Sequence, residues 1–419
     1  METKPQRNHS KPDFVHRVSR SPHSLKDLTQ RTLRLDLFRC SLNGILEVGF
    51  NVFVILIAIR FLDASQGYKS VLAAGSAFGF FLMPWTVRAC SIFNKPVTHI
   101  AGIIMAICSL ALLSCSQVKS IVPYTVFLVI AQISLSQMPG LMIHVYSSNY
   151  KSNKRGQNIS WNFIFASVVG MVFTYYFGLF LDSNGGQYHY LFWGMGLAAF
   201  FASVALFLMP SSEVKPSRSG SNLFGGLTFI WKDRLFGRML FGWMLMGLGV
   251  IMTIPLRIEY MVGNGGIGIS NREVAIIVVI YSFAGVLTSR AWGKLFDRVS
   301  FVPYRISLNI FLFSSVLIFF LSTNFWGLLI GSTLAGVANG GASIAWSLWV
   351  TKLAPSGLEA EYMGAHVFMT GVRGACAPFV GYSILGILGF EGMAYFSCSL
   401  IFVSGLIFLT VVKSPRLMA

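Results

Sequence analysis

Long apolar stretches separated by short charged stretches run along the chain from residue 37 to residue 412. Between Lys95 and Lys119 there are 23 consecutive residues without a charge, and between Lys119 and Lys151 there are 31. An α-helix needs about 20 apolar residues to cross the ~30 Å hydrocarbon core of a bilayer. Each of these stretches therefore predicts at least one membrane-spanning helix.

Counting such stretches along the whole chain gives twelve predicted helices. The gap between Arg305 and Lys352 holds 46 uncharged residues, enough for two helices joined by a tight turn near residues 322–324. Two of the twelve stretches contain a charge, because residues 37–61 include Glu47 and residues 362–386 include Arg373. The pattern predicts an all-α membrane protein with twelve transmembrane helices.

The longest predicted connection divides these helices six and six, and its Pro-Ser-Arg-Ser-Gly-Ser segment has the composition of a flexible linker. The halves resemble each other, since a shift of 204 residues places Gly374 on Gly170 and His366 on Asn162. We therefore expect two pseudo-symmetric six-helix bundles. The expected organisation is a tail (1–36), a bundle (37–209), a linker (210–235), a second bundle (236–412) and a tail (413–419).

The composition supports a membrane protein over any soluble class. The chain is 54% hydrophobic and 11% charged, whereas soluble domains carry about 25% charged residues. Its net charge of +17 would suggest nucleic-acid binding in a soluble protein. In a membrane protein the same excess is explained by the Lys and Arg residues of cytoplasmic loops. We therefore expect no nucleic-acid partner.

The distribution of basic residues predicts the orientation in the membrane. The two tails and the loops on their side hold 23 Lys and Arg residues, and the loops on the other side hold Lys69, Lys119 and Arg272. Because cytoplasmic loops carry the excess of Lys and Arg, both termini are expected to be cytoplasmic. The expected location is the plasma membrane, which in a bacterium is the inner membrane.

A short motif follows the eighth predicted helix: Gly293-Lys-Leu-Phe-Asp297-Arg298-Val-Ser. It resembles the cytoplasmic motif Gly-x-Leu-x-Asp-Arg-x-Gly-Arg of the major facilitator superfamily, with Ser300 and Phe301 in place of the last two residues. Together with the two six-helix halves and the basic central loop, the chain resembles this family over residues 37–413. The resemblance implies two bundles that expose a central site to each side of the membrane in turn.

The resemblance also implies a cytoplasmic latch made of Gly293, Asp297 and Arg298. A glycine lets two helices approach closely, and Asp297 can face the positive N-terminal end of the fifth helix near Asn158. The alternative is that these charges only follow the general excess of basic residues in cytoplasmic loops. In the first half Cys90 stands where the motif has Asp, so a symmetric latch is not expected.

Polar residues inside the predicted helices mark a candidate binding site. A lone charge at the bilayer centre costs at least about 2.5–3.5 kcal/mol, so Glu47 and Arg373 should face a water-filled cavity or a partner. Their neighbours recur at helical spacing and form polar stripes, and the family implies that helices one, four, seven and ten line the cavity. The predicted substrate- or proton-binding set is Asn43, Glu47, Asn51, Gln137, Asn162, Asn339, Ser343, Trp346, His366, Thr370 and Arg373.

Several of these residues have a structural alternative. Glu47 and Arg373 are also compatible with an ion pair between the halves, His366 with a hydrogen-bonded interior histidine, and Trp346 with a packing aromatic. Arg257 and Glu259, near the outer end of the seventh helix, are predicted to form an outer rim or gate pair.

We therefore expect a monomeric secondary active transporter of a small solute. Glu47 is the candidate for proton coupling, and Arg373 is the candidate for binding an anionic group such as a carboxylate. One alternative is a proton-coupled exporter of lipophilic cations, and another is a scaffold protein that transports nothing. The sequence has no phosphate-binding Walker motif, no metal-ligand spacing and no nucleophile motif. No enzymatic activity, cofactor or metal is expected, and the partners are the substrate, a proton and the lipid bilayer.

Overall fold

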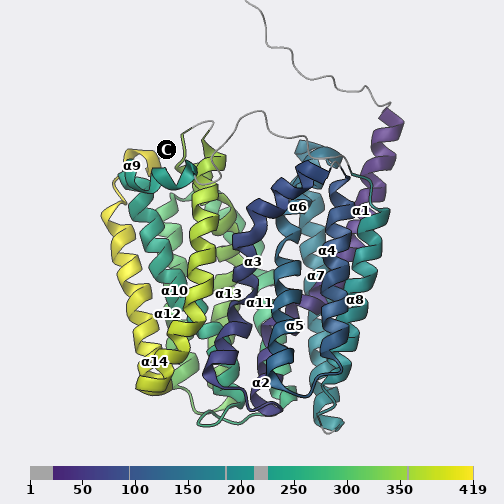
Figure 1. Ribbon diagram of the computed structural model, residues 1–419. Helices are drawn as coiled ribbons and strands as arrows, with labels where there is room; N and C mark the ends of the chain where they lie inside the picture. Colours follow the sequence, from purple (N-terminus) through teal and green to yellow (C-terminus); the bar gives the residue numbers. More distant parts are fainter. Residues whose placement is uncertain (1–21, 94, 185, 212–224, 356–357, 419) are drawn as a thin grey trace, which may run out of the picture.

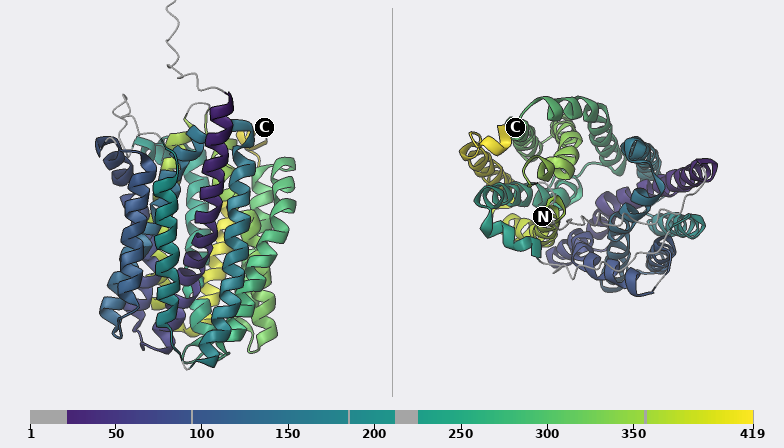
Figure 2. Two further views of the ribbon diagram at one scale, coloured as in Figure 1. Left: turned by 90° about the vertical axis from the view of Figure 1, so that its right-hand side faces the viewer. Right: turned by 90° about the horizontal axis from the view of Figure 1, so that it is seen from above.

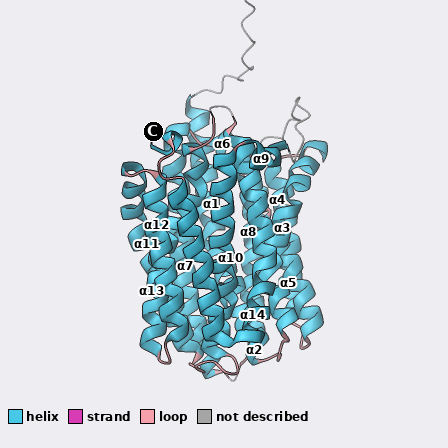
Figure 3. Ribbon diagram, turned by 90° about the vertical axis from the view of Figure 1, so that its left-hand side faces the viewer, coloured by secondary structure: helices cyan, strands magenta, loops and turns pink. Residues whose placement is uncertain are grey.

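Helices joined by short loops make up nearly all of the described chain (Figure 3). The computed structural model describes residues 22–93, 95–184, 186–211, 225–355 and 358–418. Ten of its helical segments are long and apolar enough to cross a membrane. The protein is therefore an integral membrane protein.

The first half contains the helical segments that follow one another from the start of the described chain to the linker. The first membrane span is made of α1, a π-helical turn η1 and α2, and the fourth is made of α5 and α6, which meet at Gln137. The bounds are α1 Pro22–Val48, η1 Gly49–Phe53, α2 Val54–Arg60, α3 Gln66–Phe93, α4 Val97–Cys115, α5 Ile121–Ser136, α6 Met138–Asn149, α7 Ser152–Ser183 and α8 His189–Leu208.

The second half begins with two short helices and ends with one. Its long helix α14 is two spans, because Gly389 (φ 68°) has non-helical geometry and breaks the helix. Helix α10 contains a proline, Pro255. The bounds are η2 Gly225–Thr228, α9 Phe229–Lys232, α10 Arg234–Val262, α11 Asn271–Arg298, α12 Phe301–Leu321, α13 Phe325–Leu348, η3 Trp349–Lys352, α14 Glu359–Thr410 and α15 Pro415–Met418.

These helices are consistent with twelve crossings. The ten apolar segments include residues 362–410 as one, although the break at Gly389 makes this segment two crossings. Helix α3 adds another, since its 28 residues are long enough to span a bilayer. The predicted turn near residues 322–324 is confirmed, and the Asn324 side chain caps α13 by accepting a hydrogen bond from the Gly327 N–H (3.0 Å).

Several predicted boundaries differ from the structure, and two of them place a segment expected outside a span within a helix that belongs to it. Helix α1 begins at Pro22, so the helix of the first span starts inside the segment that was expected to be a tail (1–36). Helix α12 begins at Phe301, so Arg305 lies one turn inside it and not in a loop between residues 293 and 305. Ser300, with Pro303 in the first turn that follows it, is a helix-start pattern that charge counting overlooks.

The helices form two groups that correspond to the two halves of the sequence (Figures 1 and 2). The start of α1, helix α9 and the C-terminus lie at the same end of the molecule, which we call the linker end. We call the opposite end, which holds the connection from α2 to α3 and the break at Gly389, the far end. The halves contact each other between α3 and α14, between α7 and α11, and between α2 and α10.

Span one is held against α7 by a close backbone crossing. A Cβ atom on Gly44 would lie 2.0 Å from the carbonyl oxygen of Ala166, and one on Gly170 would lie 3.0 Å from the carbonyl oxygen of Gly44. Glycine at both positions lets the two helices approach to backbone contact. This crossing fixes the position of α1 one turn before Glu47.

At the linker end, Asp233 joins three elements of the second half. It caps α10 by accepting hydrogen bonds from the N–H groups of Leu235 (3.1 Å) and Phe236 (3.2 Å). Its other carboxylate oxygen accepts hydrogen bonds from the Tyr362 hydroxyl (2.8 Å) and from Arg416 Nη1 (2.9 Å). Partial burial alone would raise the pKa of Asp233, but these hydrogen bonds and the Arg416 charge outweigh it and hold the pKa below its ordinary value.

Replacing Asp233 with alanine is expected to destabilise the second half. Loss of the cap alone costs about 0.5–2 kcal/mol, and the bonds to Tyr362 and Arg416 are lost with it. Because the folded protein holds the Asp233 pKa below its ordinary value of about 3.9, the wild-type advantage is complete above that pH and is lost at lower pH. Thermal unfolding at neutral and acidic pH checks this. Arg416→Met keeps the cap and the Tyr362 bond and removes the half-exposed ion pair, together with the bond from Arg416 to the carbonyl oxygen of Leu353 (2.6 Å), so it should cost less than Asp233→Ala.

Candidate functional site

The polar stripe on span one is accessible. Glu47 and Asn51 are exposed, and Asn43 is half-buried. The Asn43 side-chain amide donates to a Glu47 carboxylate oxygen (3.2 Å). A carboxylate at this depth is too costly to place in lipid, so an exposed Glu47 indicates a polar path through the protein.

A second accessible stripe lies on α13, in the other half. Asn339 and Ser343 are exposed and Trp346 is half-buried, so the three residues that sequence spacing grouped together do share one accessible face. Amide and hydroxyl groups beside an indole can hydrogen-bond a polar solute and pack against its rings.

The third predicted stripe, on α14, faces the interior of the second half. His366 is 0% exposed and Arg373 is 8% exposed. Arg373 Nη1 donates to the carbonyl oxygen of Trp243 on α10 (2.8 Å), and Thr370 lies between the two on the same face. The described residues include no ion pair between Glu47 and Arg373. In this conformation Glu47 and Arg373 therefore have different surroundings, one open and one closed.

Gln137 and Asn162 have structural contacts within the first half. Gln137 donates to the carbonyl oxygen of Gly79 (2.8 Å) at the junction of α5 and α6, and its own oxygen accepts a hydrogen bond from Thr86 (3.0 Å). Asn162 donates to Asp36, a fully buried carboxylate that also forms an ion pair with Arg39 (2.7 Å). Both side chains connect neighbouring helices and are buried.

A buried ion pair joins the two halves at the far end. Lys69 Nζ on α3 lies 2.8 Å from each carboxylate oxygen of Glu259 on α10. The Tyr382 hydroxyl of α14 lies 3.5 Å from one of these oxygens. Both charged side chains are 10% exposed. Of the ion pairs in the described part of the chain, this one alone connects the halves.

The predicted pairing of Glu259 with Arg257 is therefore wrong. Arg257 donates instead to the Ser315 hydroxyl (2.7 Å) and lies over the ring of Phe319 (4.5 Å). Residues two apart on an α-helix point about 200° away from each other, so they cannot face one partner. Whether either residue gates transport stays a prediction.

Two further contacts close the far end. Asp182, at the end of α7, accepts hydrogen bonds from the backbone N–H groups of Asn271 (3.2 Å) and Arg272 (2.8 Å) at the start of α11. A carboxylate at a helix N-terminus is stabilised by the helix dipole. Arg60, at the end of α2, donates to Asn271 and to the carbonyl oxygen of Ile269. Each bond joins the first half to the second.

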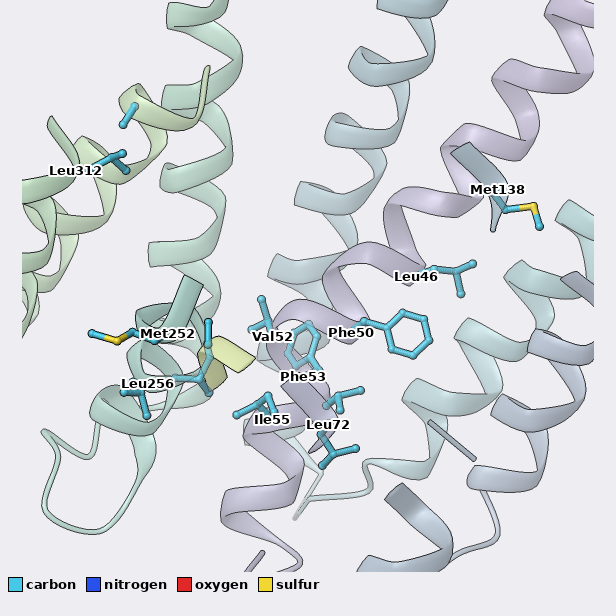
Figure 4. Packing of buried hydrophobic residues seen from close by; sticks show 14 of the residues in the cluster. Leu46, Phe50, Val52, Phe53, Ile55, Leu72, Met138, Met252, Leu256 and Leu312 are labelled. Atoms are coloured by element: carbon cyan, nitrogen blue, oxygen red, sulfur yellow. The ribbon is translucent and has the colours of Figure 1, made fainter. Parts of the chain in front are cut away.

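Apolar side chains fill the space between these polar contacts. Residues 52–55 of span one pack beside α10, and Figure 4 shows Val52, Phe53 and Ile55 near Met252 and Leu256. Four of these five side chains are at most 2% exposed, and Val52 is 6% exposed. The contact begins one turn beyond Glu47, so the accessible stripe on span one ends where the halves close.

The predicted latch residues at the linker end form no ion pair with any described residue of the other half. Asp297 and Arg298 are exposed and take part in no ion pair among the described residues. A Cβ atom on Gly293 would meet only Ile344 of α13, at 3.8 Å, so no close helix approach occurs there. The side chains just before Asn158, where a partner was expected, lie outside the described residues. The latch therefore stays a prediction, because its expected partner lies outside the described side chains.

Sequence reasoning missed three residues of the far-end closure: Lys69, Arg60 and Asp182. Lys69 was counted as a loop charge, whereas it lies in the first turn of α3. Arg60 was counted as a helix-end charge, which is correct for its position but gives no partner. The available signal was that the predicted outer side carries few charged residues. Because the excess of Lys and Arg is expected on the cytoplasmic side, charges on the outer side are candidates for specific ion pairs.

Comparison with known proteins agrees with the fold and the resemblance. A family model described as Major Facilitator Superfamily matches residues 259–418. No curated protein matches the sequence. The resemblance to this superfamily is thus confirmed by sequence for much of the second half.

Solved transporter structures match nearly the whole chain. A nucleoside transporter, NupG, has a TM-score of 0.71 with 16% sequence identity and covers 92% of this chain and 99% of its own. A bacterial homologue of the human lysosomal transporter Spinster, in an inward-facing and unoccupied conformation, has a TM-score of 0.62 with 14% identity and covers 94% of this chain and 100% of its own. The chain therefore shares the fold of these two solved transporters.

Proposed function

We propose that this chain, which has the fold of the major facilitator superfamily, is a proton-coupled secondary active transporter of a small polar solute. The observation that carries the proposal is the accessible Glu47, with Asn43 beside it and Asn51 one turn further on. A carboxylate inside a membrane span marks a substrate or proton path. The site alternates between the two sides as the halves move relative to each other.

The state of the protein supports this mechanism. If the basic linker end is cytoplasmic, as the loop charges predict, the far end is the outer side, and the ion pair of Lys69 with Glu259 closes that side. The exposed Asp297 and Arg298 then lie on the cytoplasmic side. This is the arrangement of an inward-facing transporter, the state named for the Spinster homologue.

The accessible side chains favour a neutral, hydrogen-bonding substrate. Asn51 and Asn339 offer amides and Ser343 a hydroxyl, while Trp346 offers a ring for stacking. A nucleoside has both features, hydroxyl groups and a flat base, and NupG is named as a nucleoside transporter. Nucleosides are therefore the first class to test.

Two other substrate classes remain in the test. An exporter of lipophilic cations is favoured by Glu47 itself, whose carboxylate accepts a hydrogen bond from Asn43 and is in no ion pair with a described residue. An anionic substrate requires Arg373, which is buried and bonded to Trp243 in this state, to become accessible during the cycle.

The test is uptake into proteoliposomes that contain purified protein and carry a pH gradient. A labelled nucleoside should accumulate above its external concentration and lose this accumulation when a protonophore dissipates the gradient. Competition by unlabelled nucleosides, by a lipophilic cation such as tetraphenylphosphonium and by a dicarboxylate separates the three substrate classes. If the protein neither transports nor binds a nucleoside, a lipophilic cation or a dicarboxylate, the result would favour the scaffold protein that transports nothing.

A further inference from the structure

Unpaired buried polar atoms gather in one part of the second half. Among the described residues, fourteen buried side-chain nitrogen or oxygen atoms have no hydrogen-bond partner, and nine of them lie in this one group. Folded proteins leave few such atoms, so a concentration of them needs a physical reason. The nine atoms belong to Trp243, Arg305, Trp349, His366, Thr370 and Arg373.

These side chains surround the indole of Trp243 on α10. The Arg305 guanidinium of α12 lies over the indole, with Cζ 4.2 Å from the ring centroid. The rings of His366 and Trp349 lie 5.4 Å and 5.7 Å from it, centroid to centroid. Arg373 donates to the Trp243 carbonyl oxygen from one turn further along the helices. Every member comes from the second half.

The group has many donors and few acceptors. All three nitrogens of Arg305 are unpaired, and the side chain is 0% exposed. Its contact with the Trp243 ring offsets part of the charge but satisfies none of the N–H groups. An arginine in a protein stays protonated, and a buried charge is normally paired. Neither Arg305 nor Arg373 forms an ion pair with a described acid.

We propose that this group is a binding site for a small anion, with Arg305 as its main ligand. The guanidinium supplies a planar fork of N–H donors that suits an oxyanion or a halide, and the indole N–H of Trp349 and the imidazole of His366 can complete the shell. Arg305, His366 and Trp349 are all 0% exposed. A species bound among fully buried side chains has little room, so the anion is small. Because all ligands belong to one half, the anion stays with that half when the halves move, and it is not the transported solute.

The site is independent of the proposed transport function, so it is tested by stability. Thermal unfolding of the purified wild-type protein is followed by tryptophan fluorescence in sodium gluconate, chloride, bromide, formate or phosphate at one ionic strength. A ligand that binds only the folded state raises the unfolding temperature progressively above its dissociation constant. We expect the unfolding temperature to be higher in chloride, bromide, formate or phosphate than in gluconate. Comparing the two halides with the two oxyanions then identifies the preferred class of anion. Equal unfolding temperatures in all five salts would overturn the proposal.

The variant Arg305→Met tests the assignment of the main ligand. It removes the charge and keeps a side chain that can pack, so its unfolding temperature should be the same in all five salts. In gluconate it should exceed that of the wild type, because the unpaired buried charge is gone. Arg257→Met is the matched control, since Arg257 already has an acceptor in Ser315, and its anion dependence should equal that of the wild type. An Arg305→Met protein with the full anion effect would refute the assignment.

A second measurement covers the case in which Arg305→Met does not fold. Bromide is titrated into the wild-type protein, and its quenching of tryptophan fluorescence is recorded. A bound bromide beside Trp243 and Trp349 should give a saturable component, with a midpoint equal to that of the rise in unfolding temperature. Quenching that only increases linearly with bromide would contradict the site.

Discussion

Replacing Glu259 with glutamine is expected to open the far end of the protein. The change leaves the Lys69 ammonium, whose side chain is 10% exposed, without its carboxylate partner in the closed state. Breaking one partner of a buried ion pair costs about 3–5 kcal/mol, which corresponds to a change of roughly a hundredfold or more in an equilibrium constant. In the open state both side chains can reach water, so the cost falls on the closed state alone.

The measurement is maleimide labelling of a single cysteine placed at Met252, which is 0% exposed inside the far-end contact. Glu259→Gln should speed labelling, whereas Glu273→Gln should not, because Glu273 only caps its own helix through Ser270. Replacing both Lys69 and Glu259 with methionine should restore slow labelling, since an apolar pair can replace a buried ion pair without loss of stability. Labelling of Glu259→Gln at the wild-type rate would contradict the role of the pair.

Replacing Glu47 with glutamine is expected to abolish gradient-driven accumulation of substrate while preserving exchange. Glutamine keeps the shape and can still accept the Asn43 hydrogen bond, but it cannot carry a proton. Accumulation needs net proton movement, so it should fall to the level of passive equilibration. Exchange of internal for external substrate needs none and should continue at a rate close to that of the wild type. Paired uptake and counterflow assays in proteoliposomes measure both.

Two further variants decide what Glu47 does. Glu391→Gln makes the same chemical change at an exposed position near the break at Gly389 and should leave both assays unchanged. The double variant Glu47→Gln, Arg373→Gln tests the structural ion pair. Full recovery of accumulation in the double variant would show that the two residues only neutralise each other. Stable protein without accumulation would support the proton role.

Most of the fold follows from local features of the sequence. Apolar length and the positions of charges predict where helices begin and end, as the turn at residues 322–324 illustrates. Local patterns also predict which side chains share a face. Asn339 and Ser343 do so, and so do His366 and Arg373. They do not tell which neighbour a face meets, and the stripe on α14 proved to face α10.

The contacts between the halves could not be predicted in this way. Lys69 and Glu259 are 190 residues apart, so their pairing depends on how two bundles dock. The burial of Arg305 was missed for a different reason. Counting the gaps between charges places a helix boundary at each charged residue, so Arg305 was assigned to a loop. A helix that begins before a charge, as α12 does, then carries that charge inside the protein unnoticed.

Spans one and seven each have an irregularity seven residues before their helix ends at the far end. The π-helical turn η1 precedes the seven residues of α2, and Pro255 precedes the last seven residues of α10. A π-helical turn marks a local departure from α-helical bonding, and a proline removes one backbone hydrogen bond. A π-helical turn in one span and a proline in the other thus interrupt regular α-helical hydrogen bonding at matching positions.

In terms of bending stiffness, each of these spans is a long stiff helix joined to a short helical arm through a more compliant joint. In span one the joint is η1 and the arm is α2; in span seven the joint is at Pro255 and the arm is the last seven residues of α10. The arms carry Ile55 and Leu256, which lie near each other in the apolar contact between the halves (Figure 4), and the joint of span one begins two residues after Glu47. We expect a load at the far end to bend the two joints before it rotates either of the stiff segments. We therefore expect the far end to begin to open by the deflection of two seven-residue arms, a much smaller displacement than the rotation of a whole bundle.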